Sequence, residues 1–112
     1  GINTDSVGLD SFRTTINKQR KVIMPAISMF YGVVIYIYFF DNKKHNKPHI
    51  HVKYAGSEVV LGLPDGEIME GSIPNNKMKL VEAWIEIHKE DLLANWELAV
   101  NGQEVFKIEP LK

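Results

Sequence analysis

Three of the four histidines in the chain, His45, His49 and His51, fall within seven residues. Pro48 stands before the last two, where a turn-rich stretch gives way to the alternation typical of a β-strand. Residues two apart on a strand point to the same side, with Cα atoms roughly 7 Å apart. His49 and His51 can therefore close on one ion or one phosphate group, and they mark the main candidate for a functional site.

The strand predicted for residues 49–54 alternates polar and apolar side chains, so its two faces differ in character. One face carries His49, His51 and Lys53, and we expect it to be solvated and to border a reachable, cation-rich hollow. A solvated strand face is polar by default, so a purely structural role for these histidines stays open. The other face is expected to meet the core through three side chains: Ile50, Val52 and Tyr54.

A phosphate-bearing ligand, RNA included, is the first chemistry that fits. One of His49 and His51 would act as a base and the other as an acid, while Lys53 stabilises the developing negative charge. RNA cleavage without a metal needs only such groups, because the 2′-hydroxyl is the nucleophile. Neighbouring side chains would bind the ligand: His45, Lys47 and Tyr36.

A divalent metal ion is the second chemistry, with His49 and His51 as ligands and His45 or Asp41 as a third. The positive charge of nearby lysines counts against it, because this charge lowers the affinity for a cation. We therefore expect no cofactor and keep the metal as the less favoured alternative. The lysines around the histidines are Lys43, Lys44, Lys47 and Lys53.

Composition limits the class of protein and the kind of site. The 112 residues are 45% hydrophobic and 24% charged, which are ordinary values for one globular domain. The sequence contains no cysteine, which excludes disulfides, thiolate catalysis and cysteine-based zinc sites. A net charge of −1 argues against a protein that coats nucleic acid generally. The most apolar run, residues 33–40, is far shorter than the roughly 20 residues that span a bilayer, so we expect no membrane association and a cytoplasmic location.

The N-terminal region is expected to be an appendage. Gly1 is interpreted as a cloning scar and residues 1–23 as an extension, with a short helix near residues 11–20, of a single α+β domain over residues 24–112. Packing of residues 2–23 against a second copy would give a homodimer. A further hypothesis is a non-catalytic interaction module that binds itself or a small cognate protein partner.

Hydrophobic periodicity predicts an α+β fold, a twisted antiparallel sheet of about four or five strands packed on one long C-terminal helix. The first strand is apolar on both faces, as a central strand would be. Ala55-Gly56 and residues 64–66 are expected to be turns of an antiparallel meander. The expected strands cover residues 27–40, 49–54, 58–63, 67–70 and 105–108.

The C-terminal helix is expected to open at residues 74–76, with an asparagine as its cap, and to end at residues 101–102. His88 falls on its apolar stripe, where we expect a hydrogen-bonded core histidine, and it could mark a bend in so long a helix. Asn95 shares the stripe as its partner or as a second buried polar group. The stripe consists of Met78, Val81, Trp84, Ile85, His88, Leu92, Trp96 and Ala99.

Six motifs of the chain occur together: Met24-Pro-Ala-Ile-Ser, Phe30-Tyr-Gly, Tyr38-Phe, Lys47-Pro-His-Ile-His-Val52, Gly66-Glu-Ile-Met-Glu-Gly71 and Asn95-Trp-Glu-Leu-Ala99. As a set they resemble a bacterial family known as a domain of unknown function, number 4160. The resemblance implies a small, often gene-paired protein suspected of belonging to toxin–antitoxin-like modules, with no established activity. Family members often have a second proline where Lys47 stands here, and many lack a histidine at the place of His45.

Overall fold

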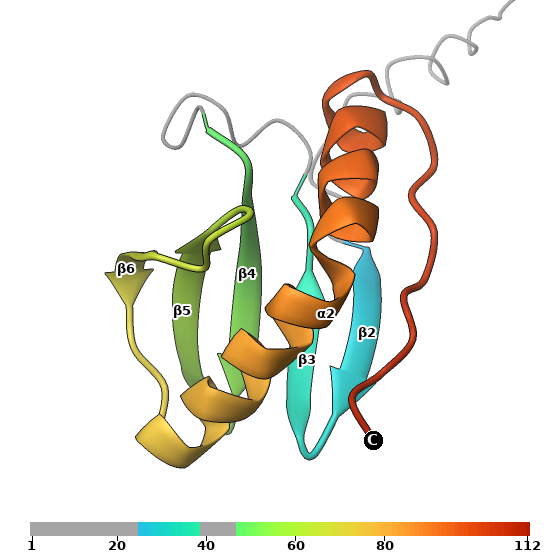
Figure 1. The fold of residues 1–112 in the computed structure, drawn as a ribbon. Helices are drawn as coiled ribbons and strands as arrows, with labels where there is room; N and C mark the ends of the chain where they lie inside the picture. The colour runs from blue at the N-terminus through green and yellow to red at the C-terminus, as the bar shows by residue number, and fades with distance from the viewer. Residues whose placement is uncertain (1–24, 39–46) are drawn as a thin grey trace, which may run out of the picture.

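Five antiparallel strands and one long helix form the described part of the chain. These are β2 (Ala26–Phe30), β3 (Val33–Tyr36), β4 (His49–Tyr54), β5 (Ser57–Gly62), β6 (Ile68–Gly71) and α2 (Asn75–Val100). The computed structural model describes residues 25–38 and 47–112. The strands lie in the order β2-β3-β4-β5-β6, and α2 crosses one face of the sheet (Figure 1). The predicted α+β class is confirmed. The helix predicted near residues 11–20 and the first histidine, His45, lie outside the described residues.

The apolar stretch predicted as one strand over residues 27–40 is a hairpin instead, so that prediction was wrong. Tyr31 and Gly32 form its two-residue turn, with φ of 51° and 82°. Positive φ at both central residues is what a tight antiparallel hairpin of type I′ needs. Gly32 favours this conformation, but Tyr31 does not signal it, so the turn was hidden inside an apolar run. β3 therefore lies beside β4, and β2 is the strand outside it.

The meander that follows β4 agrees with the sequence. Ala55 and Gly56 have φ of 47° and 85° and join β4 to β5 in a two-residue hairpin. The ladder runs without interruption from the pair His49–Gly62 to the pair Tyr54–Ser57. This register matters for the site, because it decides which side chains of β5 face those of β4.

The helix α2 packs on the sheet through the apolar stripe that its spacing predicted. Trp84 is fully buried, and its ring centroid lies 5.4 Å from that of Phe30 on β2. The backbone leaves the helical conformation at His88, with φ −115° and ψ 21°, so the predicted bend is confirmed. His88 is half-buried rather than part of the core. No helix within the two described ranges is both long and apolar enough to cross a membrane.

The two ends of α2 are capped in different ways. Pro74 is the N-cap, and no side chain caps the first turn, so the predicted asparagine cap was wrong. The carbonyl of Pro74 instead accepts the N–H of Met78 at 2.9 Å. The other end follows the prediction: Gly102 has φ 72°, and its N–H donates to the carbonyl of Ala99 at 3.0 Å.

The C-terminal segment, residues 103–112, returns beside β2 (Figure 1) but does not form the strand predicted over residues 105–108. The fully buried side chain of Asn95 explains the difference. Its amide donates to the carbonyl of Phe106 at 2.8 Å, and its oxygen accepts the N–H of the same residue at 2.9 Å. The segment touches β2 through the N–H of Ile108, which donates to the carbonyl of Ile27 at 2.8 Å.

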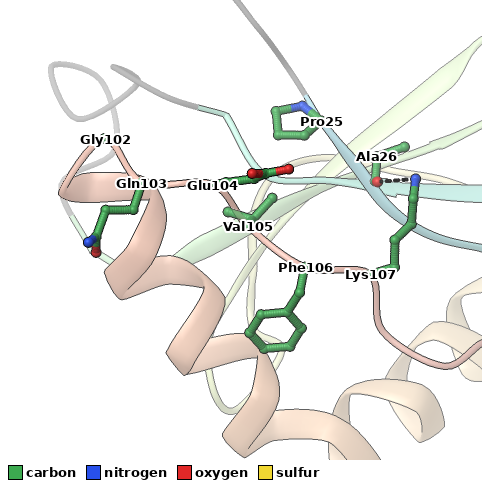
Figure 2. A pocket seen from close by; sticks show the side chains of 8 residues that line it. All are labelled: Pro25, Ala26, Gly102, Gln103, Glu104, Val105, Phe106 and Lys107. Atoms are coloured by element: carbon green, nitrogen blue, oxygen red, sulfur yellow. Dashed lines mark hydrogen bonds between the residues drawn. The ribbon is translucent and has the colours of Figure 1, made fainter.

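A groove of about 440 Å³ lies between this segment and the start of β2 (Figure 2). Lys107 closes one side of it, because its ammonium group donates to the carbonyl of Ala26 at 3.1 Å (Figure 2). None of the predicted site residues within the described ranges lines this groove. The lining residues are Pro25, Ala26, Gly102, Gln103, Glu104, Val105, Phe106 and Lys107.

Replacing Asn95 should loosen the C-terminal segment. We expect Asn95→Ala to lower the free energy of unfolding by about 2–5 kcal/mol, because it leaves two backbone groups of Phe106 without a partner. Urea denaturation measures this loss, and hydrogen exchange should show faster exchange at the Phe106 amide. The exposed Asn101, whose amide donates to the carbonyl of Glu97 at 2.9 Å, provides the control. Asn101→Ala should change stability by no more than about 0.5 kcal/mol, and equal losses in both variants would contradict this account.

Candidate functional site

The histidine strand β4 occupies the middle of the sheet, so its residues have neighbours on two strands. His51 lies opposite Tyr36 on β3, and Lys53 lies opposite Glu58 on β5. Residues paired across antiparallel strands point to the same face, so these four side chains share one face. The alternate residues of β4 are buried on the other face, as predicted: Ile50 and Val52.

His49 and His51 are buried, which corrects the expectation of a solvated face. His49 is 0% exposed and His51 is 6% exposed, whereas Lys53 is half-buried. Aromatic rings from other elements pack against both imidazoles. Tyr38 covers His51, and Trp96 of α2 contacts His49. Alternation along one strand could not reveal these contacts, because both rings come from elsewhere in the chain.

The imidazole of His51 is fixed by two contacts. The ring of Tyr38 stacks on it in parallel, with centroids 3.7 Å apart and an angle of 4° between the planes. Its Nδ1 lies 2.8 Å from Oε2 of Glu58. An ionised carboxylate can only accept, so Nδ1–H is the donor, and the neutral ring carries its lone pair on Nε2. Glu58 and Tyr38 together set the tautomer and the orientation of His51.

His49 is held in a corresponding way at the start of β4. Its Nδ1 lies 2.7 Å from the carbonyl oxygen of Lys47, which can only accept, so here too Nδ1–H donates and Nε2 carries the lone pair. The pairing of β3 with β4 ends at Tyr36 and His51. Beyond that point the ring of His49 contacts Trp96 at 4.9 Å between centroids and His51 at 5.2 Å.

Lys53 and the two tyrosines form a charged edge to this cluster. The ammonium group of Lys53 lies 5.2 Å from the ring centroid of Tyr36, within the range of a cation–π contact. Its hydrogen bond to the Tyr38 hydroxyl raises the pKa of Lys53. Burial, followed by the negative charge of Glu58, raises the pKa of Tyr38. The lysine therefore stays charged and the tyrosine stays neutral to a higher pH than usual.

Lys47 takes a different position from the one expected. Its ammonium group forms an ion pair with Glu67, just before β6, and the hydrogen bond to that carboxylate raises its pKa. The backbone carbonyl of Lys47, and not its side chain, contacts His49. Among the predicted binding residues, Tyr36 joins the cluster, Lys47 is engaged elsewhere by its side chain, and His45 lies outside the described residues.

Glu58 is the member of the cluster that the sequence analysis did not identify, because its approach to His51 depends on the pairing of two strands. The signal was the Ala55-Gly56 turn, which fixes a register that places Glu58 opposite Lys53 and diagonal to His51. Gly71 on β6 packs closely against the backbone of Glu58. A Cβ atom at Gly71 would lie 2.2 Å from the backbone oxygen of Glu58, and its φ of 78° disfavours a side chain as well.

Within the described ranges, no group of three or more histidine, cysteine or acidic side chains is placed to hold a metal ion. His45 and Asp41, the predicted third ligands, lie outside those ranges. The arrangement of His51, Glu58, Tyr38 and Lys53 can act without a metal, as a base oriented by a carboxylate beside a fixed positive charge.

Comparison with protein-family models gives one match, to the family described as Domain of unknown function (DUF4160), over residues 32–97. This range is more than half of the chain and contains β3 to β6, most of α2 and every described residue of the histidine cluster. The chain belongs to this family. The description of the family gives no activity. The chemistry of the cluster therefore has to be inferred from its geometry. Comparison with curated proteins and with solved structures gives no match.

The raised pKa values of Tyr38, caused by burial and Glu58, and of Lys53, caused by Tyr38, should make stability fall at alkaline pH. Both groups have raised pKa values in the folded state, so the native protein binds more protons than the unfolded chain once the pH passes the ordinary values of about 10 for tyrosine and 10.4 for lysine. The stabilisation is complete below this range and is lost as the pH rises through the folded values. Urea denaturation at a series of pH values up to about 11 measures the fall.

Tyr38→Phe should make the loss of stability at alkaline pH shallower. Phenylalanine has no hydroxyl that titrates, and it does not raise the pKa of Lys53. Tyr31→Phe is the matched control, since Tyr31 is exposed in the hairpin turn and is not among the groups that act on Lys53. The control should keep the wild-type dependence. An unchanged dependence in Tyr38→Phe would show that the contact is not formed in solution.

Proposed function

We propose that the protein acts on RNA or another phosphate-bearing ligand at the cluster formed by Tyr38, His51, Lys53 and Glu58. The observation that carries this proposal is the 2.8 Å hydrogen bond from His51 Nδ1 to Glu58, made by a ring that Tyr38 covers in parallel. A carboxylate–imidazole pair of this kind, here a buried ring bonded to a more exposed carboxylate, holds one tautomer and stabilises the imidazolium that forms when Nε2 accepts a proton. That is the requirement for a general base.

The remaining groups fit the same chemistry. Lys53 provides a positive charge for a phosphate oxygen, and the Tyr38 hydroxyl to which it is bonded lies beside it. In RNA, removal of the 2′-hydroxyl proton by His51 would allow that oxygen to attack the adjacent phosphorus, with Lys53 stabilising the charge on the phosphate. The bond between the phosphorus and the 5′-oxygen would break, the 5′-oxygen would take a proton from water, and a 2′,3′-cyclic phosphate would remain. His49 is fully buried, so we assign it a positioning role next to His51 rather than a contact with the ligand.

A second, broader part of the proposal is that the protein is a component of a toxin–antitoxin-like pair with a small cognate protein partner, the setting that the sequence resemblance implied. In this setting the RNA-directed activity would slow cell growth when the protein is made without its partner. The homodimer through residues 2–23 remains a separate prediction, because those residues lie outside the described ranges. Interaction without catalysis is the alternative, and it would leave RNA turnover independent of His51.

The test compares RNA turnover by the purified full chain and growth on expression of the chain alone. His51→Gln should lower turnover by about 10²- to 10⁴-fold, because it removes the base. Lys53→Met keeps the length of the side chain and removes its charge, so it should weaken RNA binding in fluorescence anisotropy and reduce turnover. Both variants should relieve any slowing of growth.

Matched controls are available on α2. His88→Gln replaces the only described histidine outside β4, and Lys89→Met removes an exposed lysine that pairs with Glu86. Both should keep wild-type turnover. A wild-type chain without effect on RNA or growth would overturn the proposal, and so would a folded His51→Gln variant with full activity.

A further inference from the structure

We infer that residues 2–23 dock in the groove between the C-terminal segment and β2 of the same chain (Figure 2), with their basic stretch beside Glu104. This contact is independent of the proposed function, because no residue of the histidine cluster lines the groove. Three features carry the inference: the backbone groups along the groove, the charge on its wall, and the point at which residues 2–23 join the described chain.

The C-terminal segment lines the groove with residues whose backbone groups are available for pairing. Alternate residues are bonded inward: Phe106 exchanges two hydrogen bonds with the Asn95 side chain, and the N–H of Ile108 donates to β2. The intervening residues, Val105 and Lys107, form no backbone hydrogen bond within the described ranges. Free backbone donors and acceptors of this kind can pair with an added extended segment. One side of the groove can therefore hold a peptide by its main chain.

The charge on the groove wall favours a basic occupant. Glu104 is exposed, and none of the ion pairs in the part of the chain that the structure describes involves it. Figure 2 shows its carboxylate directed toward Pro25. The last turn of α2, which leads into the groove at Gly102, has no basic side chain to offset the negative end of the helix dipole. The ammonium group of Lys107 is directed to the carbonyl of Ala26 instead.

The composition of residues 2–23 matches this wall. The segment has four basic and two acidic side chains, and three of the basic ones fall within residues 18–21, close before Pro25. It also has apolar side chains that can cover Val105, which is half-buried, and Phe106, which is 41% exposed. The basic residues are Arg13, Lys18, Arg20 and Lys21, and the apolar residues include Leu9, Phe12 and Ile16.

The connection to the described chain places the segment at the groove. Pro25 lines the groove, and residues 18–21 lie at most seven positions before it, within about 25 Å even if fully extended. A segment tethered at such a distance has an effective concentration in the millimolar range, so weak contacts are enough to keep the groove covered. A second copy of the chain lacks this advantage, which favours docking within one molecule over the homodimer predicted for residues 2–23.

The experiment uses paramagnetic relaxation in the full-length protein. The chain has no cysteine, so Ser11→Cys provides a single attachment point for a nitroxide spin label. We expect loss of amide signal intensity that is greatest at Val105 and Lys107 and that disappears when the label is reduced. The amide of Gly56, in the hairpin between β4 and β5, is the distant reference and should keep its intensity.

Glu104→Lys in the labelled protein should restore much of the lost intensity at Val105, because it reverses the charge beside the basic stretch. Glu90→Lys is the matched control: Glu90 is an exposed residue of α2 that does not line the groove, so the loss should persist. Both positions are exposed, so both variants should remain folded, as circular dichroism will show. Equal intensities at Val105 in the two variants would overturn the inference.

A mixed sample separates docking within one chain from docking between chains. Spin-labelled protein without ¹⁵N is combined with unlabelled ¹⁵N protein, so that any loss of intensity at Val105 must come from a second copy. We expect no loss in this sample. A loss as large as in the labelled ¹⁵N chain would overturn docking within the chain and would support the homodimer instead. No loss in either sample would show that the groove is not covered by residues 2–23.

Discussion

Two imidazoles lie buried in the middle strand of the sheet, and each needs a hydrogen-bond partner for its Nδ1. A buried N–H without an acceptor costs about 1–3 kcal/mol, so the surroundings of His49 and His51 have to provide one. The backbone does so for His49 through the carbonyl of Lys47, and the next strand does so for His51 through Glu58. The positions of β5 and of the Lys47 backbone therefore determine whether the histidines can stay buried.

The rest of the fold places these acceptors and closes the space around them. The hairpin at Ala55-Gly56 sets the register between β4 and β5, and α2 brings Trp96 against His49 after the bend at His88. Asn95, one residue before that tryptophan, holds the C-terminal segment through two hydrogen bonds to Phe106. One turn of α2 thus connects the anchoring of the chain's end with the packing of the site.

The sequence predicted those features that depend on local periodicity. The α+β class, the bend near His88, the end of the helix at Gly102 and the Ala55-Gly56 hairpin all follow from patterns within a few residues. Features that depend on contacts between distant segments were missed or misjudged. Tyr31 adopts a positive φ that tyrosine does not favour, and Asn95 binds the backbone of Phe106 in a segment that was predicted to be a strand. The histidines are covered by Tyr38 and Trp96, which lie elsewhere in the chain.

The same division holds for the site. The types of His51 and Lys53 and their common face could be read from spacing, whereas the role of Glu58 depends on a strand register, and the stacking of Tyr38 depends on the path of the chain after β3. Lys47 shows the opposite case. Its proximity to the histidines in the sequence suggested a contact with a ligand, but its ammonium group forms an ion pair with Glu67. Nearness along the chain indicates which residues can meet, and only the fold decides which do.

Gly71 has a consequence for the gene as well as for the protein. Every single-nucleotide change of a glycine codon that alters the amino acid either introduces a side chain or ends translation. A side chain at this position would collide with the backbone of the residue that supports His51. Gly71 is exposed to solvent on an edge strand and has no side chain. In a library of random point mutants it should nevertheless be among the least replaceable positions of the chain.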